Sequence, residues 1–208
     1  HPVVGDVRGL GLLCGLELTP ACAQEHAPPK VRLPANTLSG EEARAAKLYR
    51  EVLPTVVTIF TSSEILTAQG PQQRRGLGTG VLISPECHVL TAAHVVDGAD
   101  SILVKTQDGR MRPAEILYSE STADIALVRL VTPATELHHA KLGDSDRLAV
   151  GQAAYVIGAP YGFENSFSAG HISGFREFGR LYDGAILAEF IQTDAAINSG
   201  NSGGPVFD

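Results

Sequence analysis

Three residues of types that cooperate in acyl transfer stand far apart in this chain, namely His94, Asp124 and Ser202. Ser202 lies in a glycine-rich turn, Gly200-Asn201-Ser202-Gly203-Gly204-Pro205. A serine hydroxyl is a weak nucleophile near neutral pH, so it needs a histidine base and an acid that orients this base. We therefore expect Ser202 to act as nucleophile, His94 as general base and Asp124 as the orienting acid.

The order of these residues argues against one alternative. Gly200-x-Ser202-x-Gly204 also fits the G-x-S-x-G nucleophile elbow of α/β-hydrolases, in which the acid and the histidine follow the serine. Here His94 and Asp124 precede the serine, and none of the six residues after Ser202 is histidine. The elbow interpretation fails on order.

The elements around His94 and Asp124 must position their side chains. His94 follows a strand-like run that ends in Thr91-Ala92-Ala93, which would place the imidazole at the rim of a barrel. Asp124 stands at the start of an apolar strand, where a carboxylate is plausible as a buried, hydrogen-bonded partner and otherwise costly.

Short β-branched runs separated by turn residues fill the chain from Thr55 onward, and this pattern indicates an all-β fold. Asp108-Gly109 and Asp183-Gly184 are hairpin-turn signals. The first six runs predict a small antiparallel barrel, and about four further runs predict a second unit that the chain end cuts short. The predicted strands are 55–61, 79–83, 88–91, 101–106, 113–118 and 125–130, then 153–157, 166–175, 186–193 and one that starts at Val206.

Length and composition limit the remaining possibilities. A chain of 208 residues with 44% apolar residues can bury the core of one sizeable domain or of two small sub-domains. No apolar run has the length of a membrane span, and a net charge of -7 without a basic run argues against a nucleic-acid partner. Cys14, Cys22 and Cys87 are an odd number without a CxxC pair, so neither a disulfide framework nor a zinc knuckle is expected. We expect no metal and no cofactor.

Residues 1–38 are predicted to be a leader and linker, disordered or signal-like, because prolines recur there between polar residues. Residues 1–23 allow two interpretations. The first is a signal peptide with its cleavage site at Ala21-Cys22-Ala23, although Glu17 is costly in the apolar segment. In the second, residues 4–18 resemble a segment of class III PLP-dependent aminotransferases.

A short helix is predicted next. Ser39 and Glu42 form a capping box, apolar residues then recur at helical spacing, and Pro54 ends the pattern. This helix is expected to pack ahead of the strand-rich region.

The motifs quoted above resemble the signature segments of a known family. Residues 91–94, 124–127 and 200–205 resemble the three signature segments of the chymotrypsin-like (trypsin-fold) serine proteases. The similarity is closer to the HtrA/Deg branch, and it covers residues 41–208. The segments that resemble this branch are 78–81, 142–145, 156–162 and 192–198.

This resemblance implies a chymotrypsin-like double β-barrel of two six-stranded antiparallel barrels, with the site between them. The protease domain would span 39–208, with a first barrel at about 55–131 and a second, incomplete barrel at about 148–208. The implied activity is that of a serine endopeptidase that forms an acyl-enzyme intermediate.

The resemblance also assigns roles to further residues. The backbone N–H groups of Gly200 and Ser202 would form the oxyanion hole. Ala196 and Ile197 would line the primary specificity pocket, and because no carboxylate stands there, small or aliphatic substrate side chains are expected. Asn201 replaces the aspartate that pairs with a freed N-terminus in digestive relatives, so activation by N-terminal cleavage is not expected.

Further expectations concern the whole protein. The resemblance implies unfolded or peptide substrates, protein quality control, a periplasmic or secreted location and a possible homotrimer. An alternative of a different class is a catalytically silent peptide-binding fragment. It arises because family members carry further strands after the nucleophile, and often PDZ domains, that this chain lacks.

Overall fold

The computed structural model describes residues 38–67, 70–132, 134, 136–176 and 190–208. Apart from Leu38, these residues belong to one compact unit, Ser39–Asp208. Both interpretations of residues 1–23 and the hairpin signal at Asp183-Gly184 fall outside the described residues.

The predicted helix is present as α2 (Gly40–Val52) and begins at its capping box. The Glu42 N–H donates to Ser39 Oγ at 3.3 Å, and the Ser39 N–H donates to the Glu42 carboxylate at 2.6 Å. Pro54 lies in the short 3-10 helix η2 (Leu53–Thr55), where the α-helix has ended. Within the described residues, no helix is long and apolar enough to cross a lipid bilayer.

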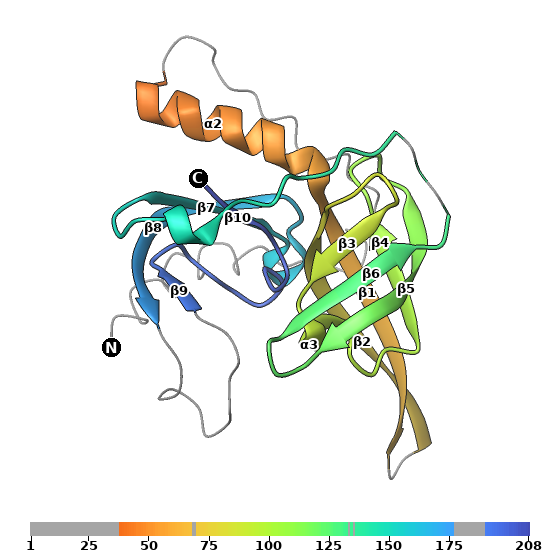
Figure 1. Ribbon diagram of the computed structural model, residues 1–208. Helices are drawn as coiled ribbons and strands as arrows, with labels where there is room; N and C mark the ends of the chain where they lie inside the picture. Colours follow the sequence, from red (N-terminus) through yellow and green to blue (C-terminus); the bar gives the residue numbers. More distant parts are fainter. Residues whose placement is uncertain (1–37, 68–69, 133, 135, 177–189) are drawn as a thin grey trace, which may run out of the picture. The chain divides into compact units, whose positions relative to one another are not determined.

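Six strands close into an antiparallel barrel with the spatial order β1-β2-β3-β6-β5-β4 (Figure 1). The all-β class is thus confirmed, and each of the six strands predicted for the first unit is present. The predicted bounds of β3 and β6 match those of the structure. The strands are β1 (Val56–Thr67), β2 (Gly70–Leu82), β3 (His88–Thr91), β4 (Ser101–Lys105), β5 (Met111–Glu120) and β6 (Ile125–Leu130).

The hairpin of β1 and β2 is longer than predicted and extends away from the rest of the barrel (Figure 1). Its pairing runs from Val56 opposite Val81 to Thr67 opposite Gly70. The prediction missed the distal half because most of its residues are polar or glycine, and its apolar residues, such as the adjacent Ile65 and Leu66, do not alternate with polar ones.

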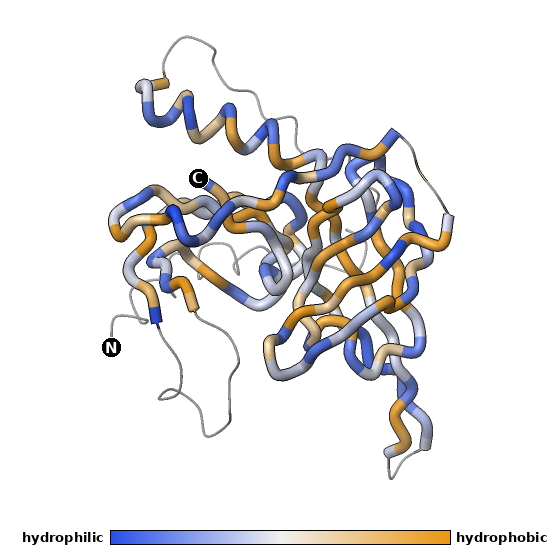
Figure 2. Tube along the Cα trace, viewed as in Figure 1, coloured by the Kyte–Doolittle hydropathy of each residue, from blue (hydrophilic) through white to orange (hydrophobic). Residues whose placement is uncertain are grey.

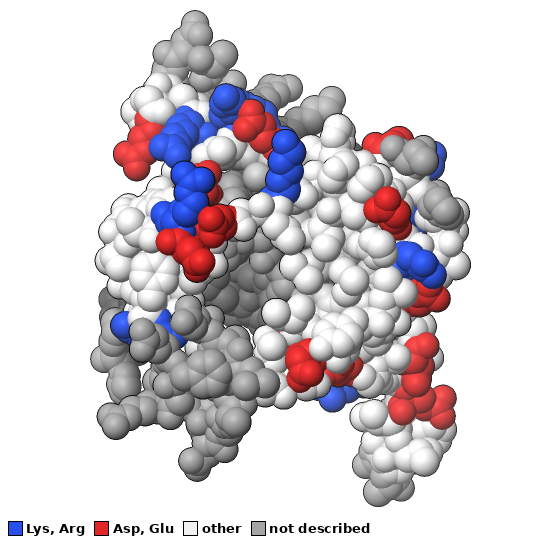
Figure 3. Space-filling view, in the orientation of Figure 1, with Lys and Arg blue, Asp and Glu red and all other residues white. Residues whose placement is uncertain are grey.

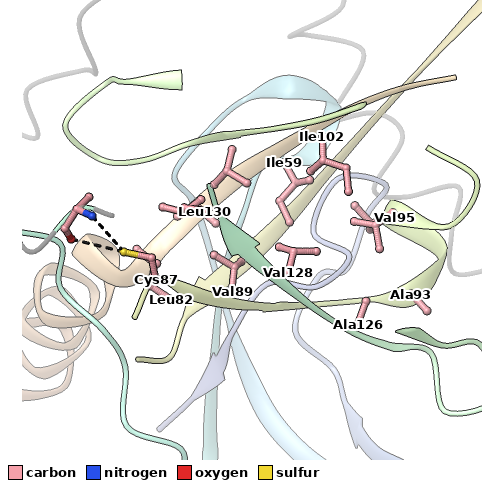
Figure 4. Close-up of a cluster of buried hydrophobic side chains, with 14 residues drawn as sticks. Ile59, Leu82, Cys87, Val89, Ala93, Val95, Ile102, Ala126, Val128 and Leu130 are labelled. Carbon is pink, nitrogen blue, oxygen red and sulfur yellow. Dashed lines mark hydrogen bonds between the residues drawn. The ribbon is translucent and has the colours of Figure 1, made fainter. Parts of the chain in front are cut away.

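Buried aliphatic side chains fill the barrel (Figure 4). Buried positions alternate with more exposed ones along β6, so Ala126, Val128 and Leu130 face the interior. Figure 2 shows the hydrophobic positions concentrated along the strands. The Cys87 thiol belongs to this core at 2% exposure and accepts the Ala134 N–H at 3.4 Å. This contact ties the chain that follows β6 to the barrel.

A second sheet contains four strands in the order β10-β7-β8-β9. Over the described residues it does not close, so the expected second six-stranded barrel is present only as an open sheet. Strand β9 is described from Phe190 onward, whereas the prediction started at residue 186. The strands are β7 (Ala153–Gly158), β8 (Ser166–Arg176), β9 (Phe190–Thr193) and β10 (Val206–Phe207).

Charged side chains of both signs gather around α2 on the face drawn in Figure 3, where acidic and basic groups are interspersed. Lys47 and Glu51 of α2 form one such pair at 3.7 Å. Both side chains are more than half exposed, at 69% and 57%, so the pair contributes little stability.

Candidate active site

His94 is presented by the single-turn helix α3 (Ala93–Val96), which directly follows β3. Ala93, Val95 and Val96 are buried and hold the turn against the barrel. The His94 side chain is 58% exposed. The imidazole therefore lies at the rim of the barrel, as the sequence pattern predicted.

Asp124 reaches His94 because of the register between β3 and β6. Thr91 pairs with Ala126, so the residue that precedes β6 lies beside the turn that follows β3. Asp124 has a left-handed backbone with φ 52°, a conformation in which aspartate is several-fold enriched among non-glycine residues. The end of one strand and the start of its neighbour thus bring the two side chains together.

The Asp124 carboxylate uses both oxygens on His94. His94 Nδ1 lies 2.7 Å from Oδ2 and 3.0 Å from Oδ1, and the His94 N–H donates to Oδ1 at 2.9 Å. With Nδ1 as the donor, Nε2 keeps its lone pair and can accept a proton. The expectation that Asp124 is buried is wrong: its side chain is 49% exposed, because its partner also stands at the open rim.

Asp97 supports this pair from the end of α3, and no local sequence pattern predicts this role. Its carboxylate accepts hydrogen bonds from Ser119 Oγ at 2.6 Å and from Ser121 Oγ at 2.8 Å. These two bonds, more than the nearby His94, lower the pKa of Asp97. The contacts join the end of α3 to the turn that leads to Asp124.

Ser202 is held against the barrel through its backbone. The Thr79 N–H donates to the Ser202 carbonyl at 2.8 Å, and Thr79 Oγ1 donates to the Gly200 carbonyl at 2.7 Å. Thr91 Oγ1 donates to the Thr79 carbonyl at 2.7 Å. Gly203 has φ 78°, and a Cβ there would collide with Thr91 and with the Thr79 carbonyl. The turn therefore docks on β2 and β3 through a contact that only glycine fits.

The structure joins His94 to Asp124, but in the described part of the chain no hydrogen bond links the His94 ring to the Ser202 hydroxyl. Bonds between nucleophile and base are often long without substrate and shorten when substrate binds. In the observed arrangement Asp124 orients the His94 ring, and the Ser202 turn packs on β2 and on β3, the strand that leads to His94.

Gly200 and Ser202 have backbone N–H groups that donate no hydrogen bond within the described residues. Gly200 is buried with φ 103°, and a Cβ there would collide with the Ala159 carbonyl. Two free donors beside a serine can stabilise the negative charge that develops on a carbonyl oxygen under attack.

The two expected pocket residues are not part of the apolar cavity found beside the second sheet. Ala196 and Ile197 are exposed, Ile197 at 56%. A cavity of about 290 Å³ lies against the second sheet instead, and neither residue lines it. Its apolar lining comes from Leu148, Ala153, Ala154, Ile172, Ile191, Val206 and Phe207.

Asn201, beside the proposed nucleophile, is 8% exposed, and its Oδ1 has no hydrogen-bond partner among the described residues. It packs so closely on Gly158 that a Cβ at position 158 would collide with it. A neutral amide tolerates this environment at a cost of about 1–3 kcal/mol, whereas an unpaired carboxylate would cost more.

A family model described as a trypsin-like peptidase domain matches residues 78–208. The chain belongs to this trypsin-like peptidase family. Within it, the chain is similar to HtrA-type proteases, so the resemblance to the HtrA/Deg branch is confirmed. The comparisons give no support to the resemblance of residues 4–18 to aminotransferases.

Two curated relatives and one solved structure illustrate the similarity. A probable periplasmic serine endoprotease DegP-like from Halomonas elongata is 44% identical over 142 residues, which are 68% of this chain and 29% of the relative. Protease Do-like 1, chloroplastic, from Arabidopsis thaliana is 33% identical over 175 residues, 82% of this chain and 40% of the relative. The structure of the HtrA-type protease AlgW with tripeptide superposes with a TM-score of 0.70 at 33% identity, covering 79% of this chain and 50% of that one. The chain thus spans half or less of each relative.

Proposed function

We propose that this chain carries the catalytic site of a serine endopeptidase, with His94, Asp124 and Ser202 as its triad. The observation that carries the proposal is the His94–Asp124 contact, in which both carboxylate oxygens engage the imidazole Nδ1 and one also accepts the backbone N–H. Family membership supports it, because trypsin-like peptidases use this chemistry.

In this mechanism Ser202 Oγ attacks the peptide carbonyl carbon while His94 Nε2 takes the hydroxyl proton. The N–H groups of Gly200 and Ser202 donate to the oxyanion of the tetrahedral intermediate. The C–N bond breaks as His94 returns the proton to the leaving amine, and an ester to Ser202 remains. Water then attacks this ester with His94 as base, which releases the acid and restores the serine. Asp124 stabilises the imidazolium in both halves of the reaction, acylation and hydrolysis of the ester.

We also propose the bounds of the domain, its second barrel and the residues of the primary pocket. The domain spans 39–208, and its open sheet is part of the second barrel of a double β-barrel. Ala196 and Ile197 line the primary pocket, so cleavage after small or aliphatic residues is expected. A peptide library checks this preference, and dominant cleavage after Arg or Lys would contradict it.

Substrates, assembly and compartment are proposed from the relatives. Unfolded or peptide substrates suit an HtrA-type protease, and the relative from Halomonas elongata is named as a periplasmic endoprotease. We propose a periplasmic or secreted location and a homotrimer. Light scattering on the purified protein measures the oligomeric state, and a monomer at micromolar concentration contradicts the trimer.

A catalytically silent peptide-binding module is the second candidate. The observation that favours it is the second sheet, which does not close over the described residues. Such a module would bind peptide without hydrolysing it.

Fluorophosphonate labelling separates the two candidates. An active serine protease forms a covalent adduct at Ser202, and Ser202→Ala abolishes it. Ser199→Ala is the matched control, because Ser199 is an exposed serine of the same turn and its removal should preserve labelling. Peptide binding measured by fluorescence anisotropy without any adduct would favour the silent module.

A further inference from the structure

The connection between β7 and β8, residues 159–165, lies against the backbone that precedes Ser202. The Ala159 N–H donates to the Gly200 carbonyl at 3.3 Å, and the Tyr161 N–H donates to the Ser199 carbonyl at 3.0 Å. Gly200 packs so tightly on Ala159 that a Cβ would collide with the Ala159 carbonyl. The path of Ser199 and Gly200 therefore depends on the path of this connection.

The 159–165 connection has an unusual backbone. Tyr161, Gly162 and Asn165 have φ of 53°, 86° and 63°, all in the left-handed region. This conformation costs a non-glycine residue about 1–2 kcal/mol. A segment with two such residues needs contacts outside itself to keep one shape.

Contacts from the closed barrel hold the end of the connection. Lys105 Nζ, at the end of β4, donates to both carboxylate oxygens of Glu164, at 3.2 and 2.9 Å. The Lys105 and Glu164 side chains are 37% and 27% exposed, so this pair is better shielded than Lys47–Glu51 on α2. A partly desolvated ion pair is less screened by water and salt than an exposed one.

Two further bonds hold Asn165, the neighbour of Glu164. Gln107 Nε2 donates to Asn165 Oδ1 at 2.8 Å, and the Tyr49 hydroxyl of α2 donates to the Asn165 carbonyl at 2.9 Å. These bonds keep the connection attached when the ion pair is broken. Loss of the pair should therefore loosen the connection rather than unfold the protein.

We infer that Lys105 and Glu164 are positioning residues for the oxyanion site: they fix the 159–165 connection, which fixes Ser199 and Gly200. Neither side chain needs to touch substrate. The effect on catalysis rests on the proposed function, whereas the effect on the connection does not.

The test compares Lys105→Met and Glu164→Gln with Lys47→Met and Glu51→Gln. The control pair has the same chemistry, but it lies on the outer surface of α2. The first measurement is amide hydrogen exchange. In the Lys105 and Glu164 variants, the amides of Ala159 and Tyr161 should exchange about tenfold faster, which corresponds to about 1.4 kcal/mol. The amides of β6 should be unchanged, and the controls should match the wild type.

The second measurement is the rate of fluorophosphonate labelling at Ser202. We expect the labelling rate to fall about tenfold while the peptide KM stays unchanged. This decrease is smaller than the 10²–10³-fold effect of losing one oxyanion donor. The charge exchange Lys105→Glu with Glu164→Lys should restore labelling in part. A surface ion pair with no positioning role would not produce a loss confined to kcat.

The outcomes separate this inference from the proposed function. Unchanged exchange at Ala159 and Tyr161 in both Lys105→Met and Glu164→Gln overturns the positioning role, whatever the labelling shows. If the Lys105 and Glu164 variants exchange faster at Ala159 and Tyr161 but the wild-type protein never labels, the positioning role is supported and Ser202 as a nucleophile is contradicted. Circular dichroism checks that each variant is folded.

Discussion

Thr79 of β2 donates its N–H to the carbonyl of Ser202 at 2.8 Å, which ties the closed barrel to the turn of the proposed nucleophile. Thr79 is 1% exposed, so this bond is shielded from water. Strand β2 also pairs with β3, which leads into the turn of His94. The proposed base and nucleophile are thus positioned from two neighbouring strands, although they stand 108 positions apart in the sequence.

Asp124→Asn should reduce kcat by about 10⁴-fold and leave the fold intact. An amide of the same shape no longer secures the tautomer in which His94 Nε2 accepts a proton. Labelling rates and thermal unfolding check this prediction. Asp100→Asn is a suitable control, since Asp100 is a carboxylate that accepts the Glu64 N–H away from His94. Equal losses in both variants would contradict the triad.

Gly203→Ala should destabilise the protein more than Gly109→Ala. Both glycines are left-handed, with φ 78° and 80°, so each substitution costs about 1–2 kcal/mol. A Cβ at Gly109 meets open space, whereas one at Gly203 collides with Thr91 and Thr79 and adds about 1–3 kcal/mol of overpacking. Urea unfolding measures the difference. Equal midpoints would show that the turn does not pack on β2 and β3 as described.

Asn201→Asp should destabilise the fold by about 3–5 kcal/mol at neutral pH. The substitution places a carboxylate at a buried site where no group in the described part of the chain donates a hydrogen bond to Oδ1. Burial raises the pKa of such a group, so stability is lost as pH rises from about 4 toward neutrality. Asn198→Asp, at an exposed position of the same segment, is the control. A stable variant at pH 7 would indicate a donor near Asn201.

Asp108→Asn should reduce the amount of folding stability that the protein loses at low pH. Hydrogen bonds from the buried Arg112, at 2.9 and 2.7 Å, hold the pKa of Asp108 well below its ordinary value of 3.8. A carboxylate with a lowered folded pKa stabilises the protein above the unfolded pKa and loses that contribution as pH falls below about 4.

The variant should therefore lose about 1.5–3 kcal/mol at pH 7, and its difference from the wild type should shrink between pH 4 and pH 2. Urea unfolding over this range checks the prediction, with Asp146→Asn in the exposed helix η3 (Ser145–Arg147) as control. A constant difference across pH would contradict the pairing.

Local patterns predicted the barrel because its strands are β-branched runs with one buried face. β3 and β6 are short and lie wholly within the barrel, so their bounds match the pattern. The distal half of the β1–β2 hairpin has no buried face and hence no alternation to detect. The helix was predictable because its cap lies within four residues of sequence.

The site was predictable in part for a related reason. His94, Asp124 and Ser202 stand in recognisable short segments, so their types and order could be identified. Lys105 and Glu164 meet across 59 residues, and only the folded chain brings them together. The half-exposed state of Asp124 also depends on what surrounds the rim, which no local pattern records.

The acid–base pair and the nucleophile differ in where they stand along the chain. His94 and Asp124 are brought together by β3 and β6 alone, whereas the Ser202 turn must close a long loop back onto β2. Chains fold from the N-terminus as they are synthesised. We expect a nascent chain to form the His94–Asp124 pair before Ser202 has emerged, so that the proposed catalytic site is completed only after the first barrel has folded.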